Sequence, residues 1–194
     1  MSVSTAFIFF LLAAAPDEDL ETDDLARRIR DGDREAFRTF FERHHGRLLG
    51  YVRSRGVPRE AAEDLVQNAF VYLWQHRKRI DPNQSLRAYL FRIGYTRAVN
   101  HHRDAERVDP DADPQAAAPS PDTPEDDVLT AELRDQIDAA VAHLPERRRT
   151  VFELCFLHGL PYREAADALS ITRKTVENHM RLALQDLRQA LTDD

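Results

Sequence analysis

Apolar residues recur every three or four positions through most of the chain, which is the spacing of amphipathic helices. Between Leu20 and Arg107 the pattern is interrupted by turn-forming residues at Gly32, at Gly56 and at the Asp81-Pro82-Asn83 tripeptide. It therefore predicts four helices, marked by apolar positions within residues 25–29, 37–52, 62–73 and 86–98. Four helices in one such stretch predict a compact N-terminal bundle.

The last third of the chain repeats this periodicity and ends in a distinctive pair of helices. Four helices are expected over residues 129–144, 145–159, 161–169 and 173–190, with a three-residue turn, 170–172, between the last two. No stretch shows the alternation typical of a half-buried strand. We therefore predict an all-α protein with two four-helix domains, the second of which contains a helix-turn-helix.

The segment between these domains has the composition of a linker. Residues 108–124 contain five prolines, four aspartates and no aromatic residue, so they cannot bury enough apolar surface to fold. We therefore expect a flexible acidic linker at 108–124, between domains at 20–107 and 125–194.

The N-terminus carries an apolar run, residues 6–15 (AFIFFLLAAA). Ten residues are too few to span a bilayer, which needs ~20, and no Lys or Arg precedes the run as in a secretory signal. We expect residues 1–19 to be either a disordered extension or the product of a start codon placed too far upstream. Export or membrane anchoring is the alternative.

Composition excludes several classes of site. Among the 194 residues Cys155 is the single cysteine, which excludes a disulfide framework and multi-cysteine metal sites and favours a reducing, cytoplasmic location. The six glycines form no Gly-rich stretch, which argues against phosphate-binding loops of nucleotide enzymes. We expect no cofactor, no metal, no small-molecule substrate and no catalytic residue.

The net charge of −7 conceals a strongly basic region. Residues 25–103 contain 17 basic and 8 acidic side chains, whereas residues 104–135 contain 2 basic and 11 acidic ones. Residues 1–24 contain six acidic side chains and no basic one. A basic domain of this kind indicates a polyanionic partner even though the whole chain is acidic.

Three helices carry candidate binding residues. The last exposes basic and amide side chains near its N-terminus, as a recognition helix in the major groove does. The helix over 86–98 mixes arginines with Tyr89, Phe91 and Tyr95, a combination that suits unpaired DNA strands. The third predicted helix has a polar patch beside Trp74, typical of a protein-docking face. For each helix the alternative is an ordinary surface with solvated charges and core aromatics.

These motifs, in this order, resemble bacterial RNA polymerase sigma factors of the extracytoplasmic-function (ECF) group, which retain only regions 2 and 4. The resemblance rests on "GDREAFRTFFERHHGRLLGYV", "AAEDLVQNAFVYLWQHRKRI", "SLRAYLFRIGYTRAVNHHR" and "LPERRRTVFELCFLHGLPYREAADALSITRKTVENHMRLAL". It covers about residues 20–190. It implies a region 2 bundle, a linker and a region 4 helix-turn-helix. A sigma factor binds core polymerase, recognises the −10 and −35 promoter elements and promotes DNA melting.

The resemblance also implies roles for particular residues. It assigns docking on the polymerase β′ clamp helices to Asp64, Gln67 and Asn68. It assigns contacts with the −10 element to Arg79, Asn83, Arg87, Tyr89, Arg92, Tyr95, Thr96 and Asn100. It assigns contacts with the −35 element to Arg173, Lys174, Thr175, Glu177, Asn178 and Arg181. Tyr89 and Thr96 stand where Trp and Asn are common in the family, so the family's −10 base preference is not transferred to this chain.

Further partners follow from the same resemblance. They are the β flap of core polymerase, promoter DNA and an anti-sigma factor that holds the chain inactive. The acidic linker would either mimic RNA in the exit path of the polymerase or act as a solvated tether.

Two other classes of protein compete with this interpretation. The last helices also resemble the DNA-binding module of LuxR-type response regulators, but no α/β receiver domain accompanies them. A metal-dependent hydrolase could use His44-His45 or His101-His102. Adjacent histidines on a helix point about 100° apart, however, so they do not converge on one ion.

Overall fold

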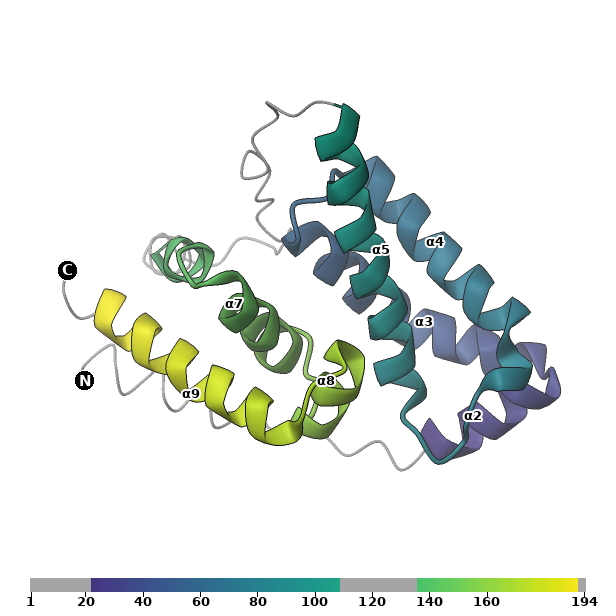
Figure 1. Ribbon diagram of the computed structural model, residues 1–194. Helices are drawn as coiled ribbons and strands as arrows, with labels where there is room; N and C mark the ends of the chain where they lie inside the picture. Colours follow the sequence, from purple (N-terminus) through teal and green to yellow (C-terminus); the bar gives the residue numbers. More distant parts are fainter. Residues whose placement is uncertain (1–21, 109–135, 192–194) are drawn as a thin grey trace, which may run out of the picture. The chain divides into compact units, whose positions relative to one another are not determined.

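The computed structural model describes residues 22–108 and 136–191, which form two compact units (Figure 1). In these ranges every regular element is a helix and there is no strand, so the all-α prediction is confirmed for the described chain. No helix in these ranges is long and apolar enough to cross a bilayer. The predicted extension at 1–19 and the predicted linker at 108–124 lie outside the described residues, except that Val108 ends a helix.

The N-terminal unit is a bundle of the four predicted helices. Its elements are α2 (Thr22–Asp31), α3 (Arg34–Ser54), α4 (Arg59–Gln75), the short 3-10 helix η1 (Arg77–Arg79) and α5 (Leu86–Val108). Helices α3, α4 and α5 pack against one another, and α2 packs against α3, α5 and η1. Figure 1 shows α4 and α5 lying side by side along much of their length.

Polar side chains at the helix starts explain where these helices begin. The Asp33 carboxylate accepts hydrogen bonds from the backbone N–H groups of Glu35 and Ala36, at 2.9 and 3.1 Å, and so caps α3. The bond from Ala36 and the adjacent Arg28 guanidinium lower the pKa of Asp33. Ser85 is the predicted cap of α5, and its hydroxyl oxygen accepts from Ala88 N at 3.1 Å.

The core of this unit is built from the apolar stripes that the periodicity marked. Its largest fully buried side chains are Ile29, Phe40, Leu48, Tyr51, Leu73, Leu86, Leu90 and Phe91. Helices α3 and α5 are in close contact at Gly94, where a β-carbon would lie 2.6 Å from Leu48 Cδ1. A glycine at this position therefore permits a tight helix contact.

The C-terminal unit contains α7 (Glu146–Phe152), η2 (Glu153–Leu157), α8 (Tyr162–Leu169) and α9 (Arg173–Ala190). Residues 136–142 are also helical, and the earlier part of the helix predicted over 129–144 lies outside the described residues. Helices α7 and α9 pack against each other.

The structure differs from the prediction over 145–159, where one continuous α-helix was expected. Helix α7 ends at Phe152 and the chain continues as a π-helical turn, η2. Three consecutive residues of this turn, Glu153, Leu154 and Cys155, are buried. Burial raises the pKa of the Cys155 thiol to about 12, so this thiol stays protonated and is not a reactive nucleophile at neutral pH.

The turn between α8 and α9 follows helix-capping rules at both ends. Ser170 adopts a left-handed conformation (φ 55°), and Ile171 N donates to Ala166 O at 3.0 Å, which closes α8. Thr172 then caps α9, because its hydroxyl oxygen accepts from Thr175 N at 3.1 Å. The start of α9, where the candidate DNA contacts lie, is therefore held by local hydrogen bonds.

Candidate functional site

One face of α4 carries all three residues predicted to dock on polymerase. Asp64, Gln67 and Asn68 are exposed and lie at i, i+3 and i+4 spacing, so they share one side of the helix. The same stripe continues through Val71, whose side chain is 45% exposed, to Gln75. This docking face of α4 is therefore polar at its N-terminal end and partly apolar further along.

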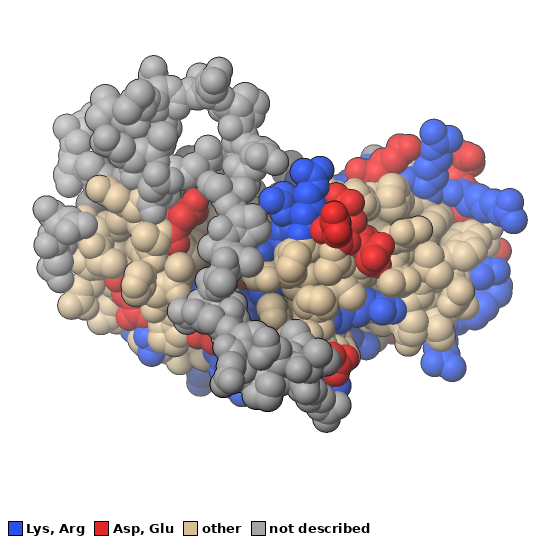
Figure 2. Space-filling view, turned by 90° about the horizontal axis from the view of Figure 1, so that it is seen from above, with Lys and Arg blue, Asp and Glu red and all other residues tan. Residues whose placement is uncertain are grey.

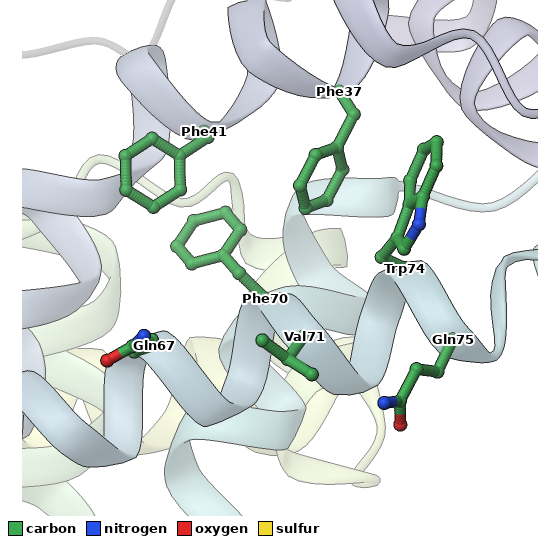
Figure 3. Close-up of a pocket in the computed structure, with 7 residues that line it drawn as sticks. All are labelled: Phe37, Phe41, Gln67, Phe70, Val71, Trp74 and Gln75. Atoms are coloured by element: carbon green, nitrogen blue, oxygen red, sulfur yellow. The ribbon is translucent and has the colours of Figure 1, made fainter.

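An apolar groove adjoins the docking face and was not predicted. It has a volume of about 250 Å³ and is lined by Phe37 and Phe41 of α3 and by Gln67, Phe70, Val71, Trp74 and Gln75 of α4. Figure 3 shows the rings of the two α3 residues facing those of α4 across the groove. The Phe37 and Trp74 ring centroids are 4.9 Å apart, and those of Phe41 and Phe70 are 4.8 Å apart. The sequence contained one sign of this groove, because Val71 is an apolar residue that lies outside the buried stripe of α4.

Positive charge is concentrated on the N-terminal unit. Figure 2 shows several groups of blue Lys and Arg side chains at the right of the view, with red acidic side chains beside some of them. Several arginines lie over aromatic rings. The guanidinium carbons of Arg77, Arg92 and Arg97 lie 4.6, 5.5 and 5.7 Å from the ring centroids of Trp74, Tyr89 and Tyr72, within range of cation–π attraction.

Helix α5 presents a second stripe of predicted contact residues. Arg92 and Thr96 are exposed at i, i+4 spacing, and Tyr89 lies half-buried one turn before them. Partial burial raises the pKa of Tyr89, so its hydroxyl stays protonated at neutral pH. Tyr95 and Asn100 are half-buried on the same helix. The stripe thus offers a cation, a hydroxyl and an aromatic ring to a ligand.

Arg87 differs from the other predicted −10 contacts. Its side chain is only 3% exposed, so in this fold it does not reach a nucleic acid on the surface. The family resemblance had assigned Arg87 a contact with the −10 element. Arg87 follows the N-cap by two residues, and the close packing of α5 against the bundle encloses that turn.

The turn before α5 holds the two remaining predicted −10 residues. Arg79 ends η1 and is exposed. Asn83 is exposed too, but its backbone N–H and its side-chain Nδ2 donate to Asp81 Oδ1, at 3.0 and 3.1 Å. Asp81 Oδ2 accepts from Gln84 Nε2 at 3.0 Å, and these bonds lower the Asp81 pKa. These hydrogen bonds hold the loop before α5 together.

Helix α9 separates its buried and exposed faces as expected. Val176, Met180, Ala183 and Leu187 are buried. The predicted −35 residues lie on the opposite side, where Arg173, Lys174, Glu177, Asn178 and Arg181 are exposed and Thr175 is half-buried. Two of these cations are tied to neighbours, because Arg173 Nε donates to Glu177 Oε1 at 2.9 Å and Arg181 donates to Asn178 Oδ1 at 3.2 Å. Lys174 forms no ion pair within the described residues.

One positioning contact of α9 was missed by sequence reasoning. Arg148 of α7 forms a part-buried salt bridge with Asp186 of α9, across 38 residues of sequence. This pair joins α7 to α9. The local sequence around Arg148 and around Asp186 does not indicate that these two side chains will pair.

The histidine pairs of the rival hydrolase interpretation pack against other groups. His44 is buried with its ring centroid 4.5 Å from that of Phe40, and His45 lies 4.8 Å from Phe41. His102 Nε2 lies 2.6 Å from the Arg55 carbonyl oxygen. In the described ranges no group of three or more His, Cys, Asp or Glu side chains gathers as a metal site would require.

Comparison with protein families agrees with the two-unit arrangement. Residues 40–108 match the family model for sigma-70 region 2, and residues 134–187 match that for sigma-70 region 4. Each of the three candidate faces, on α4, α5 and α9, lies within one of these matches.

Curated relatives extend the likeness to most of the chain. The ECF RNA polymerase sigma factor RpoE of Cereibacter sphaeroides is 29% identical over 173 residues, covering 87% of this chain and 93% of the relative. The RNA polymerase sigma factor NccH of Alcaligenes xylosoxydans is 30% identical over 176 residues, covering 86% and 92%.

Solved structures show the same fold. CnrH, in complex with the cytosolic domain of CnrY, has a TM-score of 0.65 and 26% identity, covering 89% of this chain and 98% of CnrH. RpoE of Bartonella quintana, in complex with the anti-sigma factor NepR, has a TM-score of 0.65 and 21% identity, covering 81% and 98%. With both family models matched in order and relatives aligned over nearly their full length, the chain belongs to the sigma-70 family of RNA polymerase sigma factors, in its ECF group.

Proposed function

We propose that this sigma factor docks on core RNA polymerase through α4, captures the melted −10 element with α5 and binds the −35 element with α9. Region 2 would occupy residues 20–107 and region 4 residues 125–194. The observation that carries the proposal is the presence of three exposed faces of different chemistry in the order that the family uses. The protein would act in the cytoplasm, where the polymerase is, and would be a non-enzymatic initiation factor, as sigma factors generally are.

The use of one helix to bind polymerase and of others to bind DNA has an energetic reason. Opening ~10 base pairs opposes duplex stacking of about 1.4 kcal/mol per step, more than one helix provides. Binding to polymerase can offset this cost, while cations and rings stabilise the unpaired strand. The arginine–aromatic pairs of the N-terminal unit, such as Arg92 with Tyr89, contain both groups.

The test is reconstitution with core RNA polymerase. We expect the full chain to confer selective transcription starts on genomic DNA, detected by sequencing the transcripts. Core enzyme without the chain is the control. If the two transcript sets share the same start sites, the proposed function is wrong.

Docking through α4 predicts a loss of polymerase affinity in the variant Gln67→Ala. Gln67 is exposed at the centre of the docking face, so its removal should leave the fold intact and weaken core binding roughly tenfold, a typical result for a central interface residue. Affinity can be measured by fluorescence anisotropy of labelled chain titrated with core enzyme.

The matched control for this variant is Arg59→Ala. Arg59 is exposed at the start of the same helix and pairs with Glu63 rather than contributing to the docking face. Equal core binding by the wild type and Gln67→Ala would remove α4 from the proposed interface.

Capture of the −10 element by α5 predicts slower promoter opening in the variant Tyr89→Ala. Stacking of a base on an aromatic ring contributes ~1–3 kcal/mol, so we expect the rate of open-complex formation to fall about tenfold. Permanganate reactivity of unpaired thymines gives that rate. Arg47→Ala, at an exposed position of α3, should open promoters at the wild-type rate; an equal fall in both variants would contradict a specific role for Tyr89.

We also propose that an anti-sigma protein binds this chain. The support is the likeness to two proteins solved with a bound partner, CnrH with the cytosolic domain of CnrY and RpoE of Bartonella quintana with the anti-sigma factor NepR. Affinity capture of the chain from its native host should recover one such protein in stoichiometric amount. Recovery of polymerase subunits alone would contradict the proposal.

A further inference from the structure

Helix α5 carries one apolar side chain on its exposed surface. Between Leu86 and Asp104 the exposed side chains of this helix are Arg92, Thr96, Val99, Arg103 and Asp104. Val99, which is 39% exposed, is the one apolar side chain among them. It serves neither the core nor the helix itself, because it is not buried and because β-branched residues favour a helix less than alanine or leucine does. A contact with a ligand would give this side chain a role.

Val99 shares one side of α5 with three polar residues. Arg92, Thr96, Val99 and Arg103 follow one another at spacings of four, three and four residues, so together they form a single row, the α5 stripe. The Thr96 hydroxyl donates to the Arg92 carbonyl oxygen at 2.9 Å, so its proton is used within the helix. The α5 stripe therefore has two methyl-bearing side chains at its centre and an arginine at each end.

The two arginines of the α5 stripe suit an extended polyanion. Arg92 lies over the Tyr89 ring at 5.5 Å and forms no ion pair within the part of the chain that the structure describes. Arg103 Nε lies 4.0 Å from Asp104 Oδ1, a distance at which an exposed ion pair is weak. Eleven residues of helix separate the two arginines by about 16 Å, which corresponds to about five base steps of DNA. Both can therefore meet phosphates of one duplex.

We infer that Val99 contacts the C5-methyl group of a thymine in the −10 region of the promoter, while Arg92 and Arg103 bind phosphates on either side. The inference rests on the proposed function, because it requires that α5 meets the −10 element, and it adds a base preference to that function. A valine side chain forms no hydrogen bond, and the thymine methyl is the one apolar group on the base edges of the major groove. Contact with Val99 therefore favours thymine over the other three bases.

The geometry of α5 assigns Val99 to a thymine that is still paired. Tyr89, whose ring suits an unpaired base, lies ten residues before Val99, which is about 15 Å or four base steps along the helix. The α5 stripe itself contains no aromatic ring on which an unpaired base could stack. Val99 would thus meet the duplex beside the melted segment, where the thymine methyl lies in the major groove.

Replacement of thymine by uracil tests the contact, because it removes only the C5-methyl group. In a promoter found by the reconstitution experiment, each thymine of the −10 region is replaced in turn, and the affinity of the holoenzyme is measured by fluorescence anisotropy. At one position we expect the wild type to lose about fourfold in affinity, the equivalent of one buried methylene group at ~0.8 kcal/mol. Equal affinities for thymine and uracil at every position would overturn the inference.

Variants of the α5 stripe assign the lost methyl contact to Val99. The Val99→Ala holoenzyme should bind the thymine and uracil promoters equally, and its fold should be intact because Val99 is exposed. Val99→Thr keeps one methyl group and should retain a preference of about twofold. Arg103→Ala should weaken binding to both promoters alike and keep the fourfold ratio, since a phosphate contact does not distinguish the bases. An equal loss on both promoters in Val99→Ala would assign this residue to a sugar and overturn the inference.

A template without the opposite strand at the sensitive position tests whether that thymine is paired. The uracil effect should disappear on this template, and its persistence would overturn the assignment to a paired base. The outcome for the proposed function is distinct. If the wild-type holoenzyme selects no promoter, the proposed function fails and this inference fails with it. Normal promoter selection with equal affinities for thymine and uracil overturns the inference alone.

Discussion

The double variant Lys174→Ala/Arg181→Ala is expected to lower transcription from promoters that need the −35 element by about 30-fold. Both side chains are exposed on one stripe of α9, seven residues apart, so both can face the same DNA groove. Loss of one such contact costs about 1 kcal/mol, or roughly fivefold in affinity, and two losses in one interface add approximately in free energy. Lys174 has no intrahelical ion pair in the described structure, whereas Arg181 must exchange its bond with Asn178 for a bond with DNA.

The salt dependence of promoter binding separates this mechanism from a general loss of stability. Each phosphate contact contributes about 0.9 to the slope of log affinity against log salt concentration, so the holoenzyme carrying the double variant should lose up to about two units of slope. Arg188→Ala is the control, because Arg188 is an exposed cation on the same helix about 10 Å beyond Arg181. If Arg188→Ala reduces transcription as strongly, the contact is not localised at the start of α9.

The variant Leu48→Ala is expected to destabilise the N-terminal unit by ~2–5 kcal/mol. Leu48 is fully buried between α3 and α5, and the close contact with Gly94 leaves little freedom for neighbouring atoms to fill the cavity. Urea unfolding followed by Trp74 fluorescence measures this unit alone, because the chain has no other tryptophan. Arg47→Ala, on the exposed side of α3, should change the free energy of unfolding by less than ~0.5 kcal/mol.

Gly94→Ala tests the same contact from the opposite helix. In the wild-type background its new methyl group would meet Leu48 Cδ1 at 2.6 Å, so we expect destabilisation of ~1–3 kcal/mol from overpacking. In the Leu48→Ala background that space is empty, and alanine stabilises a helix by up to ~1 kcal/mol relative to glycine. The second substitution should then be neutral or stabilising. Additive losses in the double variant would show that the two residues are not in contact.

The helices themselves are predictable from local sequence. The period of apolar residues locates α3, α4, α5 and α9, and Asp33, Ser85 and Thr172 mark the starts of three of them because their side chains satisfy free backbone N–H groups. The polar stripe on α4 and the exposed face of α9 follow from the same period. Such features depend on residues within one or two turns, which the chain order brings together without any tertiary contact.

Other features required the packed structure. Arg87 is buried although it looks like a surface arginine, and the groove beside Trp74 exists only because two phenylalanines of α3 meet α4 there. The π-helical turn η2 and the pair Arg148–Asp186 likewise depend on which helices meet.

The sequence by itself therefore determined the class of protein, the order of its main α-helices in the described ranges, and the faces that carry charge. Only the tertiary structure decided which of those polar residues remain accessible, where an apolar surface stays open and what holds the recognition helix in place. The physical reason is that helix formation depends on neighbours three or four residues away, whereas burial depends on contacts between segments tens of residues apart.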